Sequence, residues 1–130
     1  MKGTRIQKTK QKAMPKIYYL STCDTSRRIL SQLSAPDGTQ YQDIKENPLT
    51  PRQLEGLREL AGSYEALFSK RARLYRERNL KERSLGEADF RDLLLEHYTF
   101  LKRPVVVAGG QIFIGNAAKT VAAAKAALHA

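Results

Sequence analysis

The chain has 130 residues, of which 42% are apolar, and a formal net charge of +10. This length favours one soluble domain that buries a core without disulfides, and the single cysteine excludes any disulfide within the chain. No apolar run approaches the roughly 18 residues of a membrane-spanning helix, and the basic N-terminus lacks the apolar segment of a signal peptide, so we expect a cytoplasmic protein without a membrane partner.

The positive charge is concentrated at the N-terminus. Residues 1–13 carry five positive charges and no acid, which leaves 10 − 5 = +5 for the remaining residues. We interpret residues 1–13 as a disordered basic arm or as the product of an upstream start, and residues 14–130 as a single domain. The modest charge of that domain makes nucleic acid an unexpected partner.

A short strand leads directly into a helix around the only cysteine. Ile17–Leu20 is predicted as a buried strand and Thr25–Leu33 as a helix, with Cys23 at the junction. Unpaired N–H groups at a helix N-terminus stabilise a thiolate, and Arg27 adds positive charge. The alternative is a buried, inert cysteine, because free cysteines are among the most buried residues.

A second strand and a helical segment follow. Thr39–Ile44 is predicted as a weaker strand, and Thr50 as the N-cap of a helix with Pro51 at its first position. After Gly62, the apolar spacing of Tyr64, Leu67 and Phe68 predicts a second helical segment.

Lys70–Arg83 holds seven basic residues against two acids. It could contact phosphates or form a solvated helical face, and the spacing of acid and base favours the solvated face. A further helix is predicted over Glu87–Tyr98, in which His97 is a packing residue at the helix end rather than a catalytic base. We predict no metal site.

The C-terminal third predicts a hairpin and a last helix. Val105–Val107 and Ile112–Ile114 are joined by a glycine turn, Asn116 is a candidate cap, and an apolar stripe continues to Leu128. The predicted elements thus form a parallel strand–helix–strand half followed by an antiparallel hairpin and a helix. This order predicts an α/β sandwich with a small mixed sheet.

Three motifs together resemble the glutaredoxin-linked, ArsC-like arsenate reductase family, whose wider group includes the Spx regulators. They are Cys23-Asp-Thr-Ser-Arg27, Asn47-Pro-Leu-Thr-Pro51 and Leu101-Lys-Arg-Pro-Val-Val-Val107, and the resemblance covers about residues 15–129. It implies a thioredoxin-like, glutaredoxin-like fold with a helical insert over about residues 48–98. It also implies that Cys23 is the reactive cysteine, that Arg103 binds an oxyanion or a thiolate adduct, and that Pro104 is a cis-proline.

The chain departs from the family pattern at two arginines. The resemblance places Ser69, followed by Lys70 and Arg71, where such reductases have a second arginine, and Gly115 in the segment of a third. The Spx-like side of the group generally carries a Cys-x-x-Cys switch, and here Ser26 occupies the second position. Because two of the three oxyanion arginines of the family are shifted or missing, we expect arsenate reduction to be weak or absent.

A lone thiolate needs an external thiol to complete a redox cycle. By analogy we expect a small oxyanion or thiol substrate, glutathione or a similar thiol as reductant, a glutaredoxin-type partner and no bound cofactor. Thr25 and Ser26 either donate to an oxyanion or are ordinary first-turn residues of the helix. The alternative function is an Spx-like regulator that contacts RNA polymerase or another protein.

Overall fold

The computed structural model describes residues 14–130, so the arm predicted over residues 1–13 lies outside the described residues. The described chain divides into two compact units. The sheet unit comprises residues 14–43 and Arg103–Ala130, and the helical unit comprises Ile44–Lys102. The resemblance implies a helical insert over about residues 48–98, and the helical unit runs from Ile44 to Lys102.

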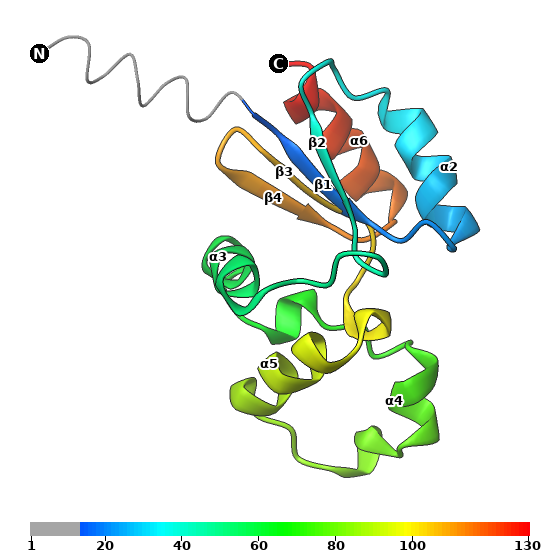
Figure 1. Ribbon diagram of the computed structural model, residues 1–130, viewed down its shortest axis with the longest axis vertical. Helices are drawn as coiled ribbons and strands as arrows, with labels where there is room; N and C mark the ends of the chain where they lie inside the picture. Colours follow the sequence, from blue (N-terminus) through cyan, green and yellow to red (C-terminus); the bar gives the residue numbers. More distant parts are fainter. Residues whose placement is uncertain (1–13) are drawn as a thin grey trace, which may run out of the picture. The chain divides into compact units, whose positions relative to one another are not determined.

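One mixed sheet is the basis of the sheet unit. Its strands are β1 (Lys16–Tyr19), β2 (Gln40–Asp43), β3 (Val105–Ala108) and β4 (Gln111–Ile114), in the order β2-β1-β3-β4. β1 pairs in parallel with β2, and the β1–β3 and β3–β4 pairs are antiparallel. Two helices, α2 (Asp24–Leu33) and α6 (Ala118–Leu128), lie side by side on one face of the sheet (Figure 1). The predicted mixed α/β architecture is confirmed.

The core of the sheet unit lies between the sheet and these helices. Ile17 and Val106 from adjacent strands pack with Ile29 and Leu33 of α2 and with Leu128 of α6. All of them are buried, and each fully buried aliphatic side chain contributes roughly 1.5–3 kcal/mol of apolar transfer free energy. This core fixes the start of α2, and therefore Cys23, against the sheet.

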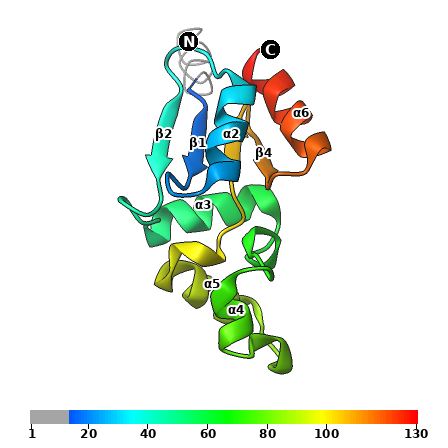
Figure 2. The same cartoon turned by 90° about the vertical axis from the view of Figure 1, so that its right-hand side faces the viewer.

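The helical unit consists of short helices (Figure 2), and it has an aromatic core. Its α-helices are α3 (Pro51–Ala61), α4 (Arg73–Glu77) and α5 (Glu87–Glu96), and its 3-10 turns are η1 (Glu65–Leu67), η2 (Leu80–Glu82) and η3 (Tyr98–Phe100). The Phe68 ring stacks on Phe100 with centroids 5.1 Å apart and tilts against Phe90 at 4.8 Å. All three rings are buried.

The first helix of this unit begins where the sequence predicts. Thr50 Oγ1 accepts from the Gln53 N–H at 3.1 Å, and Gln53 Oε1 accepts from the Thr50 N–H at 3.1 Å, which completes a capping box. Pro51 occupies the first helical position. The helix ends at Gly62, whose φ of 97° is accessible to glycine at little cost.

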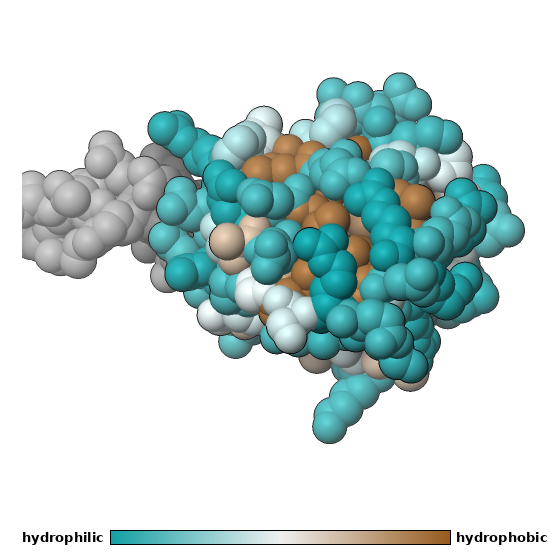
Figure 3. All heavy atoms as spheres, turned by 90° about the horizontal axis from the view of Figure 1, so that it is seen from below, coloured by the Kyte–Doolittle hydropathy of each residue, from teal (hydrophilic) through white to brown (hydrophobic). Residues whose placement is uncertain are grey.

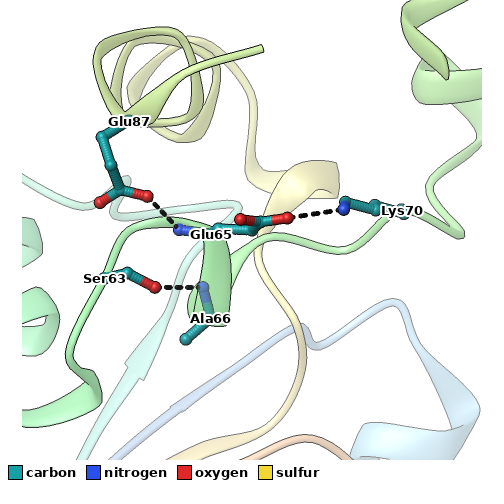
Figure 4. A network of polar contacts seen from close by, with 5 residues as sticks. All are labelled: Ser63, Glu65, Ala66, Lys70 and Glu87. Carbon is teal, nitrogen blue, oxygen red and sulfur yellow. Dashed lines mark hydrogen bonds and ion pairs between the residues drawn. The ribbon is translucent and has the colours of Figure 1, made fainter. Parts of the chain in front are cut away.

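A polar network joins α5 to η1 (Figure 4). One Glu87 carboxylate accepts from the N–H groups of Tyr64 and Glu65 at 2.7 and 3.1 Å, so it caps η1 from a distant part of the sequence. Glu65 in turn pairs with Lys70 at 2.7 Å, and Ser63 Oγ accepts from the Ala66 N–H at 3.0 Å. The free N–H groups of a one-turn element are thereby satisfied.

Three predicted details are wrong. The helical segment expected after Gly62 is only the 3-10 turn η1, because Phe68 then forms an extended bridge with Leu101. The run Lys70–Arg83 is not one helix, since the left-handed backbone of Asn79 (φ 53°) interrupts it after α4. Asn116 does not cap α6, whose N-cap is Ala117.

On the face seen in Figure 3, hydrophilic residues lie around and across apolar ones. Lys70 Nζ lies 5.9 Å from the centroid of the Phe90 ring, and Arg78 Cζ lies 5.8 Å from the centroid of the Phe100 ring. Long cationic side chains can cover aromatic surface in this way while their charged ends stay in water. Within residues 14–130, no helix has the length and apolar character needed to cross a membrane.

Candidate active site around Cys23

The sheet topology brings two chain segments to one edge of the sheet. β1 and β3 are antiparallel neighbours, with Tyr18 opposite Val105. The loop after β1 and the residues before β3 therefore emerge at the same edge. β2 runs parallel to β1 and ends there too, and Asp43 Oδ1 accepts from the Ser21 N–H at 3.3 Å.

Cys23 is the N-cap residue of α2. Its backbone is extended (φ −105°, ψ 115°), its N–H donates to the Leu20 carbonyl at 3.1 Å, and its own carbonyl accepts from the Arg27 N–H at 3.1 Å. The side chain is a free thiol of intermediate exposure. An N-cap side chain lies in front of the unpaired N–H groups of the first helical turn, where a negative charge is favoured.

The surroundings of the thiol favour the thiolate. Burial is the largest single influence and raises the pKa of Cys23, but the N–H and hydroxyl of Ser26, the positive charge of Arg103 and the N–H of Thr25 together lower this pKa below the ordinary cysteine value. A lowered pKa increases the thiolate fraction near neutral pH, and the thiolate is the nucleophilic form. Cys23 therefore has the electrostatic setting of a reactive cysteine.

Ser26 is one of the two first-turn residues that the sequence offers as candidate donors. Ser26 is 0% exposed, and its Oγ has no hydrogen-bond partner in the structure. The N–H and hydroxyl of Ser26 nevertheless lower the pKa of the Cys23 thiol. Spacing alone places Ser26 on the same side of the helix as Cys23, but only the structure shows that its hydroxyl is buried without a hydrogen-bond partner.

Arg27 is directed elsewhere. Its guanidinium pairs with Asp24 on the exposed surface of α2, and 61% of its side chain is accessible. The expected thiolate stabilisation by Arg27 is thus replaced by Arg103, whose charge acts on Cys23. Thr25 contributes through its backbone N–H rather than through its hydroxyl.

Lys70 and Arg71 belong to the helical unit. Lys70 pairs with Glu65, and hydrogen bonding to that carboxylate raises the pKa of Lys70. The Arg71 N–H donates to Ser69 Oγ at 3.3 Å, and the Arg71 carbonyl accepts from Arg76. Their expected role in anion binding remains a prediction.

Pro104 follows a cis peptide bond, as the resemblance implies. Its carbonyl accepts from the Gly115 N–H at 2.9 Å, which ties the start of β3 to the end of β4. Pro104 and Gly115 line a shallow apolar crevice together with Val106, Phe113 and Thr120.

His97 acts as a helix-end residue. It ends α5, and its Nδ1 accepts from the Thr99 N–H at 3.0 Å at the start of η3. In residues 14–130, no three histidine, cysteine or carboxylate side chains gather closely enough to hold a metal ion.

A mixed sheet with a cysteine at the helix start after β1 and a cis-proline before β3 defines a thioredoxin-like fold. The sequence profile of the ArsC family matches residues 18–124, and the chain belongs to this family.

Relatives and solved structures agree with this assignment. The chain is 30% identical over 105 residues to the uncharacterized protein YfgD of Escherichia coli K12, a match that covers 78% of this chain and 87% of that protein. It is 28% identical to an arsenate reductase from Vibrio cholerae, with a TM-score of 0.68 and 85% and 97% of the two chains covered. An arsenate reductase related protein from Brucella melitensis shares the fold at 22% identity, with a TM-score of 0.65 and 85% and 92% covered.

Proposed function

We propose that this protein is a monothiol oxidoreductase in which Cys23 exchanges with low-molecular-weight disulfides, with glutathione as the natural candidate. The observation that carries the proposal is the partly accessible Cys23 thiol, whose pKa is raised by burial but lowered overall by Ser26, Arg103 and Thr25. A structural cysteine lacks such surroundings, because in apolar burial its pKa is raised.

The chemistry needs two exchange steps. The Cys23 thiolate attacks one sulfur of oxidised glutathione, the S–S bond breaks, and one glutathione leaves as a thiolate while the other remains in a mixed disulfide. A second thiolate, from glutathione or a glutaredoxin-type protein, then attacks the glutathione sulfur and releases Cys23. The external thiol is required because the chain has no second cysteine.

Arsenate is expected to be a poor substrate. An arsenate ester on Cys23 carries negative charge that the family, by resemblance, meets with three arginines, and here only Arg103 is clearly retained. Each hydrogen bond to a charged group is worth roughly 1.5–3 kcal/mol, so two missing donors correspond to about two to four orders of magnitude in rate if each acts in the transition state. A mixed disulfide demands less of the site.

The test is a direct comparison of the two substrates. Purified protein is incubated with oxidised glutathione and followed by intact-protein mass spectrometry, and in parallel with arsenate, reduced glutathione and glutaredoxin. We expect one glutathione per chain, none on Cys23→Ser, and arsenate turnover well below about 1 per second.

Two results would contradict the proposal. A Cys23 that resists oxidised glutathione would remove the thiol exchange and favour a cysteine-independent binding function. Arsenate turnover at about 1 per second or faster would instead indicate an efficient arsenate reductase.

A further inference from the structure

The excess positive charge of the described chain is concentrated in one short segment of the helical unit, Lys70–Arg83, which we call the basic run. Residues 14–130 have a net charge of +5, and the basic run, with seven cations and two acids, has 7 − 2 = +5 as well. The rest of the described chain is therefore neutral, since 5 − 5 = 0. A charge distribution of this kind favours the binding of a polyanion at the basic run.

The basic run is a folded segment. α4 and η2 are joined by a tight turn at Asn79, whose backbone is left-handed. The Asn79 N–H donates to the Arg76 carbonyl and the Glu82 N–H donates to the Asn79 carbonyl, both at 3.1 Å. Leu80, which is 2% exposed, anchors η2 in the core of the unit. The turn therefore holds the cations of α4 and η2 on one compact surface.

Four cations of the basic run have no carboxylate partner among residues 14–130. Three others form ion pairs with carboxylates, namely Lys70, Arg73 and Arg78. The four cations without such a pair are all exposed, and they are Arg71, Arg76, Lys81 and Arg83. The spacing of acid and base that favours a solvated face presupposes one continuous helix, and the turn at Asn79 removes that condition.

The apolar side chains of the basic run are turned inward. Ala72 and Leu80 are buried, and Leu74 and Tyr75 are half-buried, with the Tyr75 ring centroid 5.9 Å from that of Phe68. Every exposed residue of the run is polar, and all but one of them are charged. A protein interface has an apolar centre with aromatic anchors, whereas contacts to a phosphate backbone need only cations and other donors. The surface therefore fits nucleic acid better than an acidic protein.

The elements of the basic run are too short to read bases. α4 has five residues and η2 has three, whereas proteins that read duplex DNA directly insert a longer helix or a β-ribbon into the major groove. Contacts to phosphates hold a duplex but carry no sequence information by themselves. A nucleic acid on this surface is therefore recognised by its charge.

We infer that the basic run is a binding surface for the phosphate backbone of nucleic acid, without sequence preference. The residues that contact phosphates are the four cations without a carboxylate partner. This activity goes beyond the proposed thiol exchange and does not depend on it. The expectation that nucleic acid is not a partner averages the charge over the whole domain, whereas the structure shows that the basic run carries all of the excess within residues 14–130.

The experiment measures the binding of the full chain to a short fluorescein-labelled DNA duplex of mixed sequence, by fluorescence anisotropy at several salt concentrations. The basic-run variant neutralises three exposed cations of the surface: Arg76→Gln, Lys81→Gln and Arg83→Gln. The matched control removes the same charge from three exposed positions outside the run: Arg52→Gln, Lys119→Gln and Lys125→Gln.

Four phosphate contacts contribute about −3.6 to the slope of log K against log salt, which corresponds to roughly hundredfold weaker binding when salt rises from about 50 to about 200 mM. The basic-run variant should reduce the magnitude of this slope by about 2.7 and bind about tenfold or more weakly at the lower salt concentration. The control should keep most of the slope. Cys23→Ser and a duplex of permuted sequence should both give the wild-type curve.

Three results would overturn the inference. The first is no binding of the wild type to the duplex at about 50 mM salt. The second is an equal slope for the basic-run variant and the control, which would mean that the charge acts without regard to its position. The third is binding of a labelled poly-glutamate peptide as tightly as the duplex and with the same dependence on the basic run, which would indicate an acidic protein partner.

If the basic-run variant does not fold, as judged by circular dichroism, Arg83→Gln alone decides the question. This single change should reduce the magnitude of the salt slope by about 0.9, and an unchanged slope would contradict the inference. None of these outcomes affects the proposed thiol exchange, which is tested on Cys23 with oxidised glutathione.

Discussion

The helical unit and the sheet unit use their polar groups differently. In the helical unit, polar groups pair with one another: Glu87 caps η1, Lys70 pairs with Glu65, and Arg78 pairs with Glu96. In the sheet unit, the hydroxyl of Ser26 and the charge of Arg103 act on a sulfur atom. The first pattern links parts of the helical unit, whereas the second lowers the pKa of the Cys23 thiol.

The pairing of polar groups in the helical unit extends to the basic run Lys70–Arg83. Three cations of Lys70–Arg83 form ion pairs with carboxylates of the helical unit: Lys70, Arg73 and Arg78. Hydrogen bonding to Glu96 raises the pKa of Arg78, and hydrogen bonding from Arg78 lowers the pKa of Glu96. Three of the seven cations in this run therefore serve as ion-pair partners within the helical unit.

The largest effect is expected from the aromatic core of the helical unit. Phe68→Ala should lower the free energy of unfolding by about 3–5 kcal/mol, because Phe68 is 1% exposed and contacts three other aromatic rings. Denaturant unfolding measures this, with Leu60→Ala at a 43% exposed position as the control. A loss below about 1 kcal/mol would show that the cluster is not the core of this unit.

The second effect concerns the charge near the thiol. Arg103→Met should slow iodoacetamide alkylation of Cys23 by up to about tenfold at neutral pH, because a cation that favours the thiolate is removed. Lys125→Met, in the last turn of α6, removes the same charge from an exposed position and should have little effect. Equal rates for the two variants would mean that the charge of Arg103 does not act on the sulfur.

A smaller effect is expected at the start of α3. Thr50→Ala should lower the free energy of unfolding by about 1 kcal/mol, since it removes the acceptor for the Gln53 N–H. Thr50→Ser keeps the oxygen and should lose much less. The alkylation rate of Cys23 should not change in either variant, and a change would show that the capping box affects the thiol.

The smallest effect is a pH dependence of stability. Burial raises the pKa of Cys23, but Ser26, Arg103 and Thr25 lower it overall, whereas an unfolded cysteine titrates near about 8.5. Between these two pKa values the unfolded state binds more protons, so the free energy of unfolding should rise with pH there and fall as pH drops through the folded pKa.

The contribution of Cys23 is measured as the difference in the free energy of unfolding between the wild type and Cys23→Ser, by denaturant unfolding at several pH values. A difference that shrinks as pH rises through this window would mean that folding raises the pKa of the thiol.

Local sequence signals predicted the sheet unit well. The strand before Cys23, the helix after it and the hairpin from Val105 to Ile114 are each specified by short-range patterns of apolar and turn residues. The cap formed by Thr50 and Pro51 was predictable for the same reason. Cys23 itself followed from its place between a strand and a helix.

The remaining features depend on contacts between distant residues. The segment after Gly62 has helical spacing, but the bridge between Phe68 and Leu101 and the bond from the Ser69 N–H to the Phe100 carbonyl draw it into an extended conformation. The sequence predicted that Arg27 acts on the thiol, but its guanidinium pairs with Asp24, the first residue of α2. The environment of the Ser26 hydroxyl likewise depends on packing rather than on spacing.

The strand pairings show which parts of the chain build the sheet. All the strand pairings of the sheet come from residues 16–43 and 105–114, so the helical unit contributes none of them. It occupies the connection between β2 and β3, and both ends of that connection leave the sheet at the edge where Cys23 is found. A change in the length or charge of the helical unit therefore removes none of the strand pairings of the sheet.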